Sequence, residues 1–293
     1  MRINLIKKVI YRTMAIKICD LHTHSTFSDG TATPEELICA AKACGLAAVA
    51  LTDHNTVSGL PDFLAAAEEA GIEAIAGTEI SAVHGEREMH IVGLGIAPRQ
   101  FGAVTAFFAP YREAKEGSTR ALVEALTKGG YPLDYDALLQ GIDGQPNRAH
   151  VASALVAAGY VSSVKEAFDT LLGTEHGFYR EPVRPTAEEA IALLHSVGAR
   201  AVLAHPFYDF TEEELTAFLG EVATWEHRFD AMETRYSEYS EEEAAAAARI
   251  AAHFGLKESG GSDFHGERKP DIALGAGRGN LIVPYEFWEC LKP

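Results

Sequence analysis

The chain has few cysteines and no long apolar run. Four of its 293 residues are cysteine, and none belongs to a C-x-x-C pair. This spacing argues against a disulfide framework and predicts reduced, mostly buried thiols in a cytosolic protein. The cysteines are Cys19, Cys39, Cys44 and Cys290. Because no apolar run approaches the ~20 residues that span a bilayer, we expect a cytoplasmic protein with no membrane partner.

Positive charge is also scarce. The chain has 25 Lys and Arg residues against 42 Asp and Glu residues, a formal net charge of −17. Long nucleic acids and membrane surfaces recruit basic patches, so the sequence argues against both as partners. A small phosphorylated ligand is still compatible, since a few local cations or metal ions can overcome the overall charge. Residues 1–13 are basic but lack the apolar stretch of a secretory signal, and we interpret them as a leader.

The rest of the chain alternates between strand-like and helical patterns. Short apolar runs predict buried strands. These runs lie at 16–19, 46–51, 72–76, 89–94, 199–204, 229–233 and 256–259. The helical stretches between them begin with capping boxes, such as Thr33 with Glu36 and Thr186 with Glu189. Alternating strands and helices imply an α/β fold whose parallel strands are joined by right-handed crossovers.

Strand-like runs are missing between about Arg99 and Pro182. Helical stretches fill this part instead, at 103–128, 134–140, 147–158 and 163–172. We therefore predict a mainly helical insertion at 100–182, carried by a barrel domain that combines residues 14–99 and 183–293.

His22 and His24 lie at the end of the first predicted strand. They are two positions apart, and alternate side chains of a strand point to the same face, so the two imidazoles share one face. Further His, Asp and Glu residues follow other predicted strand ends or, for His90, lie on a strand. The full set is His22, His24, Asp29, His54, Glu79, His90, His205, Asp263 and His265. In an α/β barrel the strand ends converge on one face, and charged groups are rarely buried unless paired or coordinated. The set therefore predicts a metal site.

Nine ligands are too many for one ion. A catalytic zinc keeps about three protein ligands and an open position, so this set suits two or three divalent ions, with Glu79 able to bridge two of them. Imidazole and carboxylate without thiolate favour Mn²⁺, Fe²⁺ or Zn²⁺ over a copper or structural-zinc site. Glu233 also ends a predicted strand, but its neighbours match no ligand motif.

Six short motifs carry a family resemblance. They are Asp20-Leu-His-Thr-His24 with Ser28-Asp-Gly30, Leu51-Thr-Asp-His-Asn55, Gly77-Thr-Glu79, Met89-His-Ile-Val-Gly93, Ala204-His-Pro206 and Gly261-Ser-Asp-Phe-His-Gly266. In this order, over residues 20–266, they resemble the PHP (polymerase and histidinol phosphatase) family of metal-dependent phosphoesterases, within the amidohydrolase-like superfamily. The stretch 100–180 bears a weaker resemblance to the helical insertion of the nucleotide-phosphatase branch.

The resemblance implies a distorted (β/α)7 barrel with a site for up to three ions, Mn²⁺ first, with Fe²⁺ or Zn²⁺ as alternatives. Carried over by motif, the ligands are His22, His24, Glu79 and Asp263 for the first ion, Glu79, His90 and His205 for the second, and Asp29, His54 and His265 for the third. Many relatives have a histidine where this chain has Asp29.

The chemistry expected of such a site is phosphoester hydrolysis. A water that bridges two cations becomes a hydroxide near neutral pH and attacks phosphorus, while the cations polarise the phosphoryl oxygens. Asp53, beside His54, is a candidate to orient an imidazole or to shuttle a proton. His205 is expected to be a ligand, with the acid for the leaving group as its alternative role.

A phosphorylated substrate also needs cations from the protein. The candidates are Arg148 first, with His150 beside it, then Arg180 and Lys115. Tyr179 or Phe178 could stack on a base or simply pack.

We predict a phosphoesterase that acts on a small phosphorylated metabolite, either a nucleoside bisphosphate or a nucleotide or cyclic sugar phosphate. The alternatives are a 5′–3′ exonuclease on short oligonucleotides, a histidinol-phosphate phosphatase, an amidohydrolase of C–N bonds and a non-catalytic metal-bound regulatory module. The oligomeric state stays open.

Overall fold

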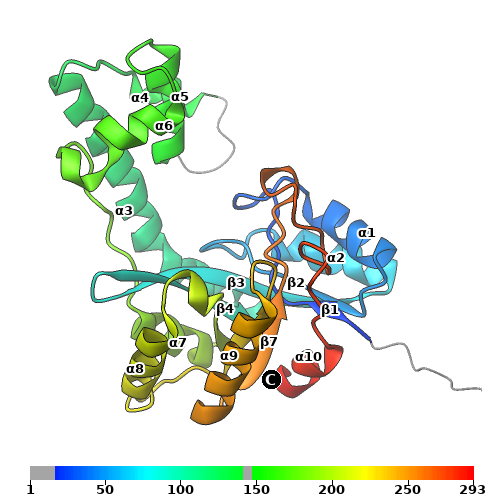
Figure 1. Ribbon diagram of the computed structural model, residues 1–293. Helices are drawn as coiled ribbons and strands as arrows, with labels where there is room; N and C mark the ends of the chain where they lie inside the picture. Colours follow the sequence, from blue (N-terminus) through cyan, green and yellow to red (C-terminus); the bar gives the residue numbers. More distant parts are fainter. Residues whose placement is uncertain (1–16, 141–146) are drawn as a thin grey trace, which may run out of the picture.

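The computed structural model describes residues 17–140 and 147–293. Its centre is a seven-stranded sheet that curls into a nearly closed barrel, with the strands in sequence order (Figure 1). The strands are β1 (Cys19–Asp20), β2 (Ala48–Leu51), β3 (Glu73–His84), β4 (Arg87–Leu94), β5 (Arg200–Leu203), β6 (Ala231–Tyr236) and β7 (Lys257–Gly261). The two ends of the sheet meet where the Leu21 amide donates to the Gly260 carbonyl at 3.2 Å. The predicted distorted (β/α)7 barrel is confirmed.

One strand runs against the expected direction. β4 pairs antiparallel with β3 and with β5, whereas the other neighbouring pairs are parallel. The prediction of parallel strands throughout was therefore wrong. β3 continues to His84, and only Gly85 and Glu86 separate it from β4, whereas a parallel crossover needs a dozen or more residues. Gly85 has a φ of 61°, a conformation that glycine adopts without steric cost in a tight turn.

Four of the helices around the barrel begin at the predicted caps. Thr33, Thr186, Thr211 and Ser240 each form a capping box with the glutamate three residues later. The helices are α1 (Pro34–Ala43), α2 (Leu60–Ala70), α7 (Ala187–Ser196), α8 (Glu212–Val222), α9 (Glu241–Phe254) and α10 (Tyr285–Leu291).

Successive strand residues face two different apolar clusters. Val49 and Leu51 pack in the large cluster beneath the outer helices, whereas Ala48 and Ala50 pack in a second cluster together with Trp288 of α10. This alternation is the two-residue period of a strand. The Trp288 indole nitrogen also donates to Glu73 at the start of β3, at 2.7 Å. α10 therefore covers the end of the barrel where the parallel strands begin.

The segment after β4 is helical and stands beside the barrel (Figure 1). It comprises α3 (Phe101–Lys128), α4 (Tyr135–Leu139), α5 (Arg148–Ala157) and α6 (Val164–Ala167). Val104 and Phe108 in the first half of α3 pack in the barrel core, whereas Leu122 and Leu126 in its second half pack in a separate cluster with α5. α3 therefore links two cores. The division of the chain at 99/100 and 182/183 stays a prediction, and the predicted leader 1–13 lies outside the described residues.

The cysteines differ from expectation. Cys19 is buried and unpaired, but Cys39, Cys44 and Cys290 are exposed, so the prediction of mostly buried thiols was wrong. The reason for Cys39 is helical phase, because Leu37, Ile38 and Ala41 occupy the buried face of α1. Within the described ranges, no helix is both long enough and apolar enough to cross a bilayer.

Candidate metal centre

All nine predicted ligands gather at one end of the barrel. They form four overlapping groups, and within each group the donor atoms lie within 4.8 Å of one another. The groups are His24–Asp29–His54–His265, His22–His24–Asp263, His22–Glu79–His205 and His54–Glu79–His90. Most of these residues follow strand ends, but Glu79 and His90 lie within β3 and β4. The antiparallel course of β4 brings His90 to this end of the barrel from inside a strand.

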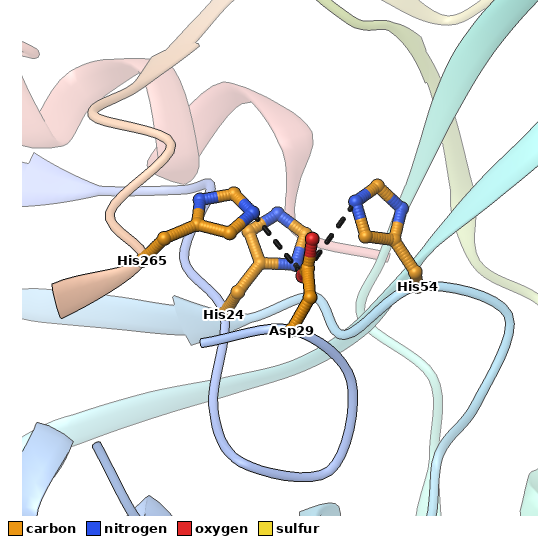
Figure 2. Close-up of side chains that lie close together, drawn as sticks. All are labelled: His24, Asp29, His54 and His265. Carbon is orange, nitrogen blue, oxygen red and sulfur yellow. Dashed lines mark ion pairs between the residues drawn. The ribbon is translucent and has the colours of Figure 1, made fainter. Parts of the chain in front are cut away.

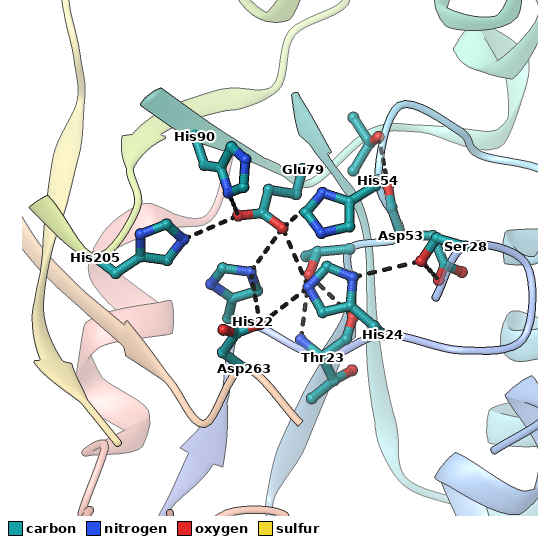
Figure 3. A network of polar contacts seen from close by, with 12 residues as sticks. His22, Thr23, His24, Ser28, Asp53, His54, Glu79, His90, His205 and Asp263 are labelled. Atoms are coloured by element: carbon teal, nitrogen blue, oxygen red, sulfur yellow. Dashed lines mark hydrogen bonds and ion pairs between the residues drawn. The ribbon is translucent and has the colours of Figure 1, made fainter. Parts of the chain in front are cut away.

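Glu79 lies at the centre of the cluster and is 1% exposed (Figure 3). Its two oxygens face different imidazoles. Around Oε2 lie His22 Nε2 at 3.2 Å, His24 Nε2 at 3.1 Å and His54 Nδ1 at 3.1 Å; around Oε1 lie His90 Nδ1 at 2.8 Å and His205 Nε2 at 3.2 Å. A carboxylate whose two oxygens face separate sets of imidazoles has the arrangement needed to bridge two cations.

Several nitrogen and oxygen atoms that could bind a metal ion are buried without a hydrogen-bond partner among the described residues. They are His22 Nε2, His24 Nε2, His54 Nδ1, His205 Nδ1 and Glu79 Oε2. Each unsatisfied buried polar group costs about 1–3 kcal/mol, so a set of them calls for an occupant. Two ligand atoms that each lie about 2.1 Å from one cation are about 3 Å apart. The nearest nitrogens of His22, His24 and His54 lie at such distances from Glu79 Oε2. The residues therefore fit divalent cations.

The charge states of the carboxylates and of His54 suit cation binding at neutral pH. Burial alone would raise the pKa of Glu79, but the imidazoles of His54, His22 and His90 hold it well below its usual value. Burial, together with His24 and His90, lowers the pKa of His54 to about 3. Because metal ligands must be deprotonated, Glu79 and His54 are ready to bind without losing a proton.

His24 behaves differently. Burial alone would lower its pKa, but Asp263 and Glu79 raise it to about 9. The same carboxylates, with Glu233, raise the pKa of His22 well above its usual value. These two imidazoles must therefore release protons when a cation binds.

Asp29 belongs to the most open of the four groups (Figure 2). Its Oδ1 lies 3.2 Å from His265 Nε2 and 3.8 Å from both His24 Nδ1 and His54 Nε2, and its side chain is 41% exposed. The carboxylate thus adds a negative charge to a group of three imidazoles.

The backbone of the site is strained. Within the described ranges, the non-glycine residues with positive φ are Asn55 at 53°, His205 at 26° and Asp263 at 56°. Such conformations cost about 1–3 kcal/mol each for most residues and cluster at functional sites. Two of the three, His205 and Asp263, are predicted ligands, and Asn55 follows a third predicted ligand, His54.

Glu233 holds two predicted ligands, His22 and His205, in place. It is 1% exposed; its Oε1 accepts from His22 Nδ1 at 2.9 Å, and its Oε2 accepts from the His205 amide at 2.7 Å. The first bond leaves His22 Nε2 as the nitrogen that faces Glu79, and the second fixes the strained turn at His205. A carboxylate behind a ligating histidine is a common feature of metal sites. The available sequence signal was its place at the end of the predicted strand 229–233, whereas in the structure Glu233 lies within β6.

Tyr236 and Lys269 occupy one oxygen of Asp263. The Tyr236 hydroxyl and Lys269 Nζ donate to Oδ2 at 2.9 and 2.6 Å, whereas Oδ1 lies 3.2 Å from His24 Nε2. Sequence reasoning missed both residues. Tyr236 ends β6 and could have been found by its position, but no pattern marks Lys269.

Asp20 ties three loops together beneath the ligands. Its carboxylate accepts from the backbone amides of His22, Ser262 and Gly275 at 3.3, 2.8 and 2.8 Å. Gly261, at the end of β7, lies so close to β1 that a Cβ there would stand 2.3 Å from the Cβ of His22. Glycine is therefore required for this approach.

Asp53 anchors a loop. Its carboxylate is buried and accepts from the Ser25 amide at 2.8 Å and from the hydroxyls of Ser25 and Ser28, both at 2.6 Å (Figure 3). In the described part of the chain these serines, and no imidazole, donate to it. Asp53 therefore acts on the cluster through the loop that carries Asp29.

Two of the predicted phosphate-binding residues, Lys115 and His150, have charged neighbours that shift their pKa values. Lys115, on α3, has its pKa lowered by desolvation and by Arg184, while Asp29 and Glu88 act in the opposite direction. His150, near the start of α5, has its pKa lowered by partial burial and by Arg268 and Lys115. Lys115 thus lies within electrostatic range of Asp29, and His150 lies within range of Lys115 and of Arg268, in the turn after His265.

Arg148 and Arg180 are placed differently. The Arg148 guanidinium lies over the rings of Tyr179 and Phe168, 4.3 and 5.7 Å from their centroids. Arg180 is exposed, and its carbonyl accepts from Ser118 at 2.5 Å. The structure therefore brings Lys115 toward the cluster and gives Arg148 aromatic partners inside the helical segment.

Comparison with known proteins settles the family. The model of the PHP domain matches residues 20–258. The chain belongs to the PHP domain family. A 5′-3′ exoribonuclease of Haemophilus influenzae is 35% identical to this PHP protein over 84% of this chain and 89% of its own. A 3′,5′-nucleoside bisphosphate phosphatase of Chromobacterium violaceum is 33% identical over 86% of this chain and 90% of its own.

The fold comparison agrees. A solved structure described as a metal-dependent phosphoesterase, from Bifidobacterium adolescentis, superimposes with a TM-score of 0.73 at 29% identity and covers 94% of this chain and 95% of its own. The prediction of a PHP metal-dependent phosphoesterase is confirmed at the level of the family. The family and the donor set agree on metal ions as the cofactor.

Proposed function

We propose that this PHP protein hydrolyses the bond between phosphorus and O3′ of a nucleotide that carries a 5′ phosphate. The observation that carries the proposal is the cluster around Glu79, whose two oxygens face separate sets of imidazoles. Such an arrangement suits a reaction in which negative charge accumulates on phosphoryl oxygens.

The proposal keeps the ligand assignment made from the sequence. His22, His24, Glu79 and Asp263 would hold one ion, Glu79, His90 and His205 a second, and Asp29, His54 and His265 a third. When bound, such ions, with Mn²⁺ as our first choice, lower the pKa of a water and polarise the phosphoryl oxygens. The residues around them fix the geometry: Glu233 orients His22 and His205, and Asp53 holds the loop of Asp29.

The phosphate that does not react would bind to the positive groups near Asp29. We rank Lys115 and His150 first, joined by Arg268, because Lys115 and Arg268 both lower the pKa of the His150 imidazole from separate elements. Arg148 and Arg180 follow, since Arg148 already lies on Tyr179 and Phe168. In a chain with a net charge of −17, converging positive groups favour an anionic ligand.

The leaving O3′ needs a proton as the bond to phosphorus breaks. For His205 we prefer the role of metal ligand, since its Nε2 lies 3.2 Å from Glu79 Oε1. Its role as an acid is the alternative, because its Nδ1 has no hydrogen-bond partner in the described ranges.

A second candidate is stepwise 5′–3′ hydrolysis of short RNA. The likeness to the Haemophilus influenzae exoribonuclease favours it. A nucleoside 3′,5′-bisphosphate has the 5′ phosphate and the 3′ phosphoester of an RNA 5′ end without the following nucleotide, so one site could accept both. The acidic chain favours short substrates over long ones.

The test is a substrate series with the metal-loaded protein: adenosine 3′,5′-bisphosphate and 5′-phosphorylated oligoribonucleotides of increasing length. A cyclic sugar phosphate, histidinol phosphate and an amide substrate serve as comparisons. We expect the highest kcat/KM on the bisphosphate or the shortest oligonucleotides, and loss of hydrolysis with a chelator. Hydrolysis of the amide alone, or of none of these compounds, would contradict the proposal and favour an amidohydrolase or a non-catalytic module.

A further inference from the structure

The turn after β5 presents an exposed aromatic ring beside the ligand cluster. In the turn Pro206–Tyr208, Pro206 is buried and Phe207 half-buried, whereas Tyr208 is 71% exposed. The Tyr208 ring lies 5.8 Å from the ring of His205, in an edge-to-face arrangement. A single exposed aromatic residue is ordinary on a protein surface, so its significance lies in its position next to a predicted metal ligand.

The backbone around Tyr208 is held on several sides. The Tyr208 amide donates to the His205 carbonyl at 2.8 Å, and the Phe207 amide donates to the Tyr239 hydroxyl at 3.0 Å. The Arg87 guanidinium donates to the Asp209 carbonyl. A ring carried by a fixed backbone loses little conformational freedom when a ligand covers it, which favours binding.

We propose that Tyr208 is the stacking platform for the nucleobase of the substrate, and thereby makes the site select nucleotides over phosphorylated sugars without a base. This inference rests on the proposed function. Base stacking on an aromatic ring tolerates any base, because every base has a π face. Lys115, the first candidate for the phosphate, lies within electrostatic range of Asp29, which belongs to a different ligand group from His205. The 5′ phosphate and the base would therefore contact different sides of the cluster.

Phe27 is the competing aromatic residue. It lies in the loop before Asp29 and is 42% exposed. Its ring, however, lies against Gly59, where an added Cβ would stand 2.9 Å from Phe27 Cδ2. Phe27 thus already has a packing partner at the start of α2, which favours Tyr208 as the platform.

The test compares kcat/KM for adenosine 3′,5′-bisphosphate with kcat/KM for ribose 3,5-bisphosphate, which lacks the base. We expect Tyr208→Ala to lower the ratio of the two about tenfold, as loss of one stacked base does, and Tyr208→Phe and Tyr208→Trp to retain it. Isothermal titration with AMP and ribose 5-phosphate gives a second readout, in which Tyr208→Ala weakens AMP binding more. Tyr160→Ala is the matched control, since Tyr160 is an aromatic residue of the helical segment that is 36% exposed.

The outcomes separate the two proposals. An active wild-type protein whose ratio is unchanged in Tyr208→Ala would overturn the stacking role and leave the proposed function intact. A ratio that falls in Phe27→Ala instead, or one that falls as much in Tyr208→Phe as in Tyr208→Ala, would also overturn it. A wild-type protein that hydrolyses neither compound would overturn the proposed function, and the stacking role with it.

Discussion

The barrel end and the helical segment hold their polar side chains in opposite ways. In the barrel, Glu79 is 1% exposed, and Glu233 and Asp20 fix the ligands and their loops through buried hydrogen bonds. In the helical segment, the Lys115 side chain is exposed on α3, although neighbouring groups partly desolvate its ammonium. α3 joins the two regions but packs in a different core at each end. We propose a division of labour in which the barrel performs the chemistry and holds the base, and the helical segment contributes groups that bind the 5′ phosphate.

The sharpest way to break this comparison is to change Glu79. We expect Glu79→Gln to lower kcat/KM about 1,000-fold or more and to remove bound metal, because an amide cannot supply two anionic oxygens to a multinuclear centre. Metal content and phosphate release from adenosine 3′,5′-bisphosphate measure the effect. Glu166→Gln, on the surface of α6, is the control and should match wild type. Retained activity in Glu79→Gln would show that the barrel cluster is not the reaction centre.

Glu233 tests whether the hydrogen-bonded support of the ligands matters. We expect Glu233→Gln to reduce metal affinity or kcat about 10- to 100-fold, the usual effect of losing a carboxylate behind a ligating histidine. Metal titration followed by steady-state kinetics separates an effect on metal affinity from an effect on kcat. An effect on KM alone, with metal affinity unchanged, would contradict a role in orienting His22 and His205.

Substitutions of Lys115 and Arg148 test which residue of the helical segment binds the phosphate. Lys115→Ala should raise KM about tenfold with metal content unchanged, since one charge-assisted contact to a phosphate is lost. Arg148→Ala should instead lower Tm by about 2–4 °C, because it removes contacts with two aromatic rings. The reverse result, a large KM effect from Arg148→Ala and none from Lys115→Ala, would return Arg148 to the phosphate site.

The smallest effect concerns pH and the metal-free protein. The pKa of His24 is raised from 6.5 to about 9 in the folded chain, so its contribution to stability is complete below pH 6.5 and is lost as pH rises through 9. The Tm of the metal-free protein should therefore fall by a few degrees across this range relative to the metal-loaded protein, in which His24 carries no proton. Parallel melting curves at several pH values measure this. Equal pH dependence with and without metal would contradict it.

The barrel was predictable because its signals are local. Short apolar runs and capping boxes such as Thr33 with Glu36 mark the elements, and the ligand motifs recur where the predicted strands end. β4 was assigned the wrong direction because the strand pattern was ended at 76, whereas β3 continues to His84 and leaves room only for a hairpin.

The residues that support the site could be predicted only in part. Glu233 ends the predicted strand 229–233, and this position is a signal for a supporting residue. The bond of Lys269 to Asp263 depends instead on how a loop folds back, which no periodicity encodes. Asp53 was expected to orient an imidazole or shuttle a proton, whereas its carboxylate accepts from Ser25 and Ser28. Arg148 was named because it lies at a helix start, a position that does not reveal its contact with Tyr179.

One titration tests the central claim most directly. Metal-free protein is titrated with Mn²⁺ while bound metal and phosphate release from adenosine 3′,5′-bisphosphate are measured on the same samples. The account predicts two or three bound ions per chain, with hydrolysis that rises as they bind and is lost when a chelator removes them. Full hydrolysis in the metal-free protein, or no Mn²⁺ bound by the wild-type chain, would contradict it.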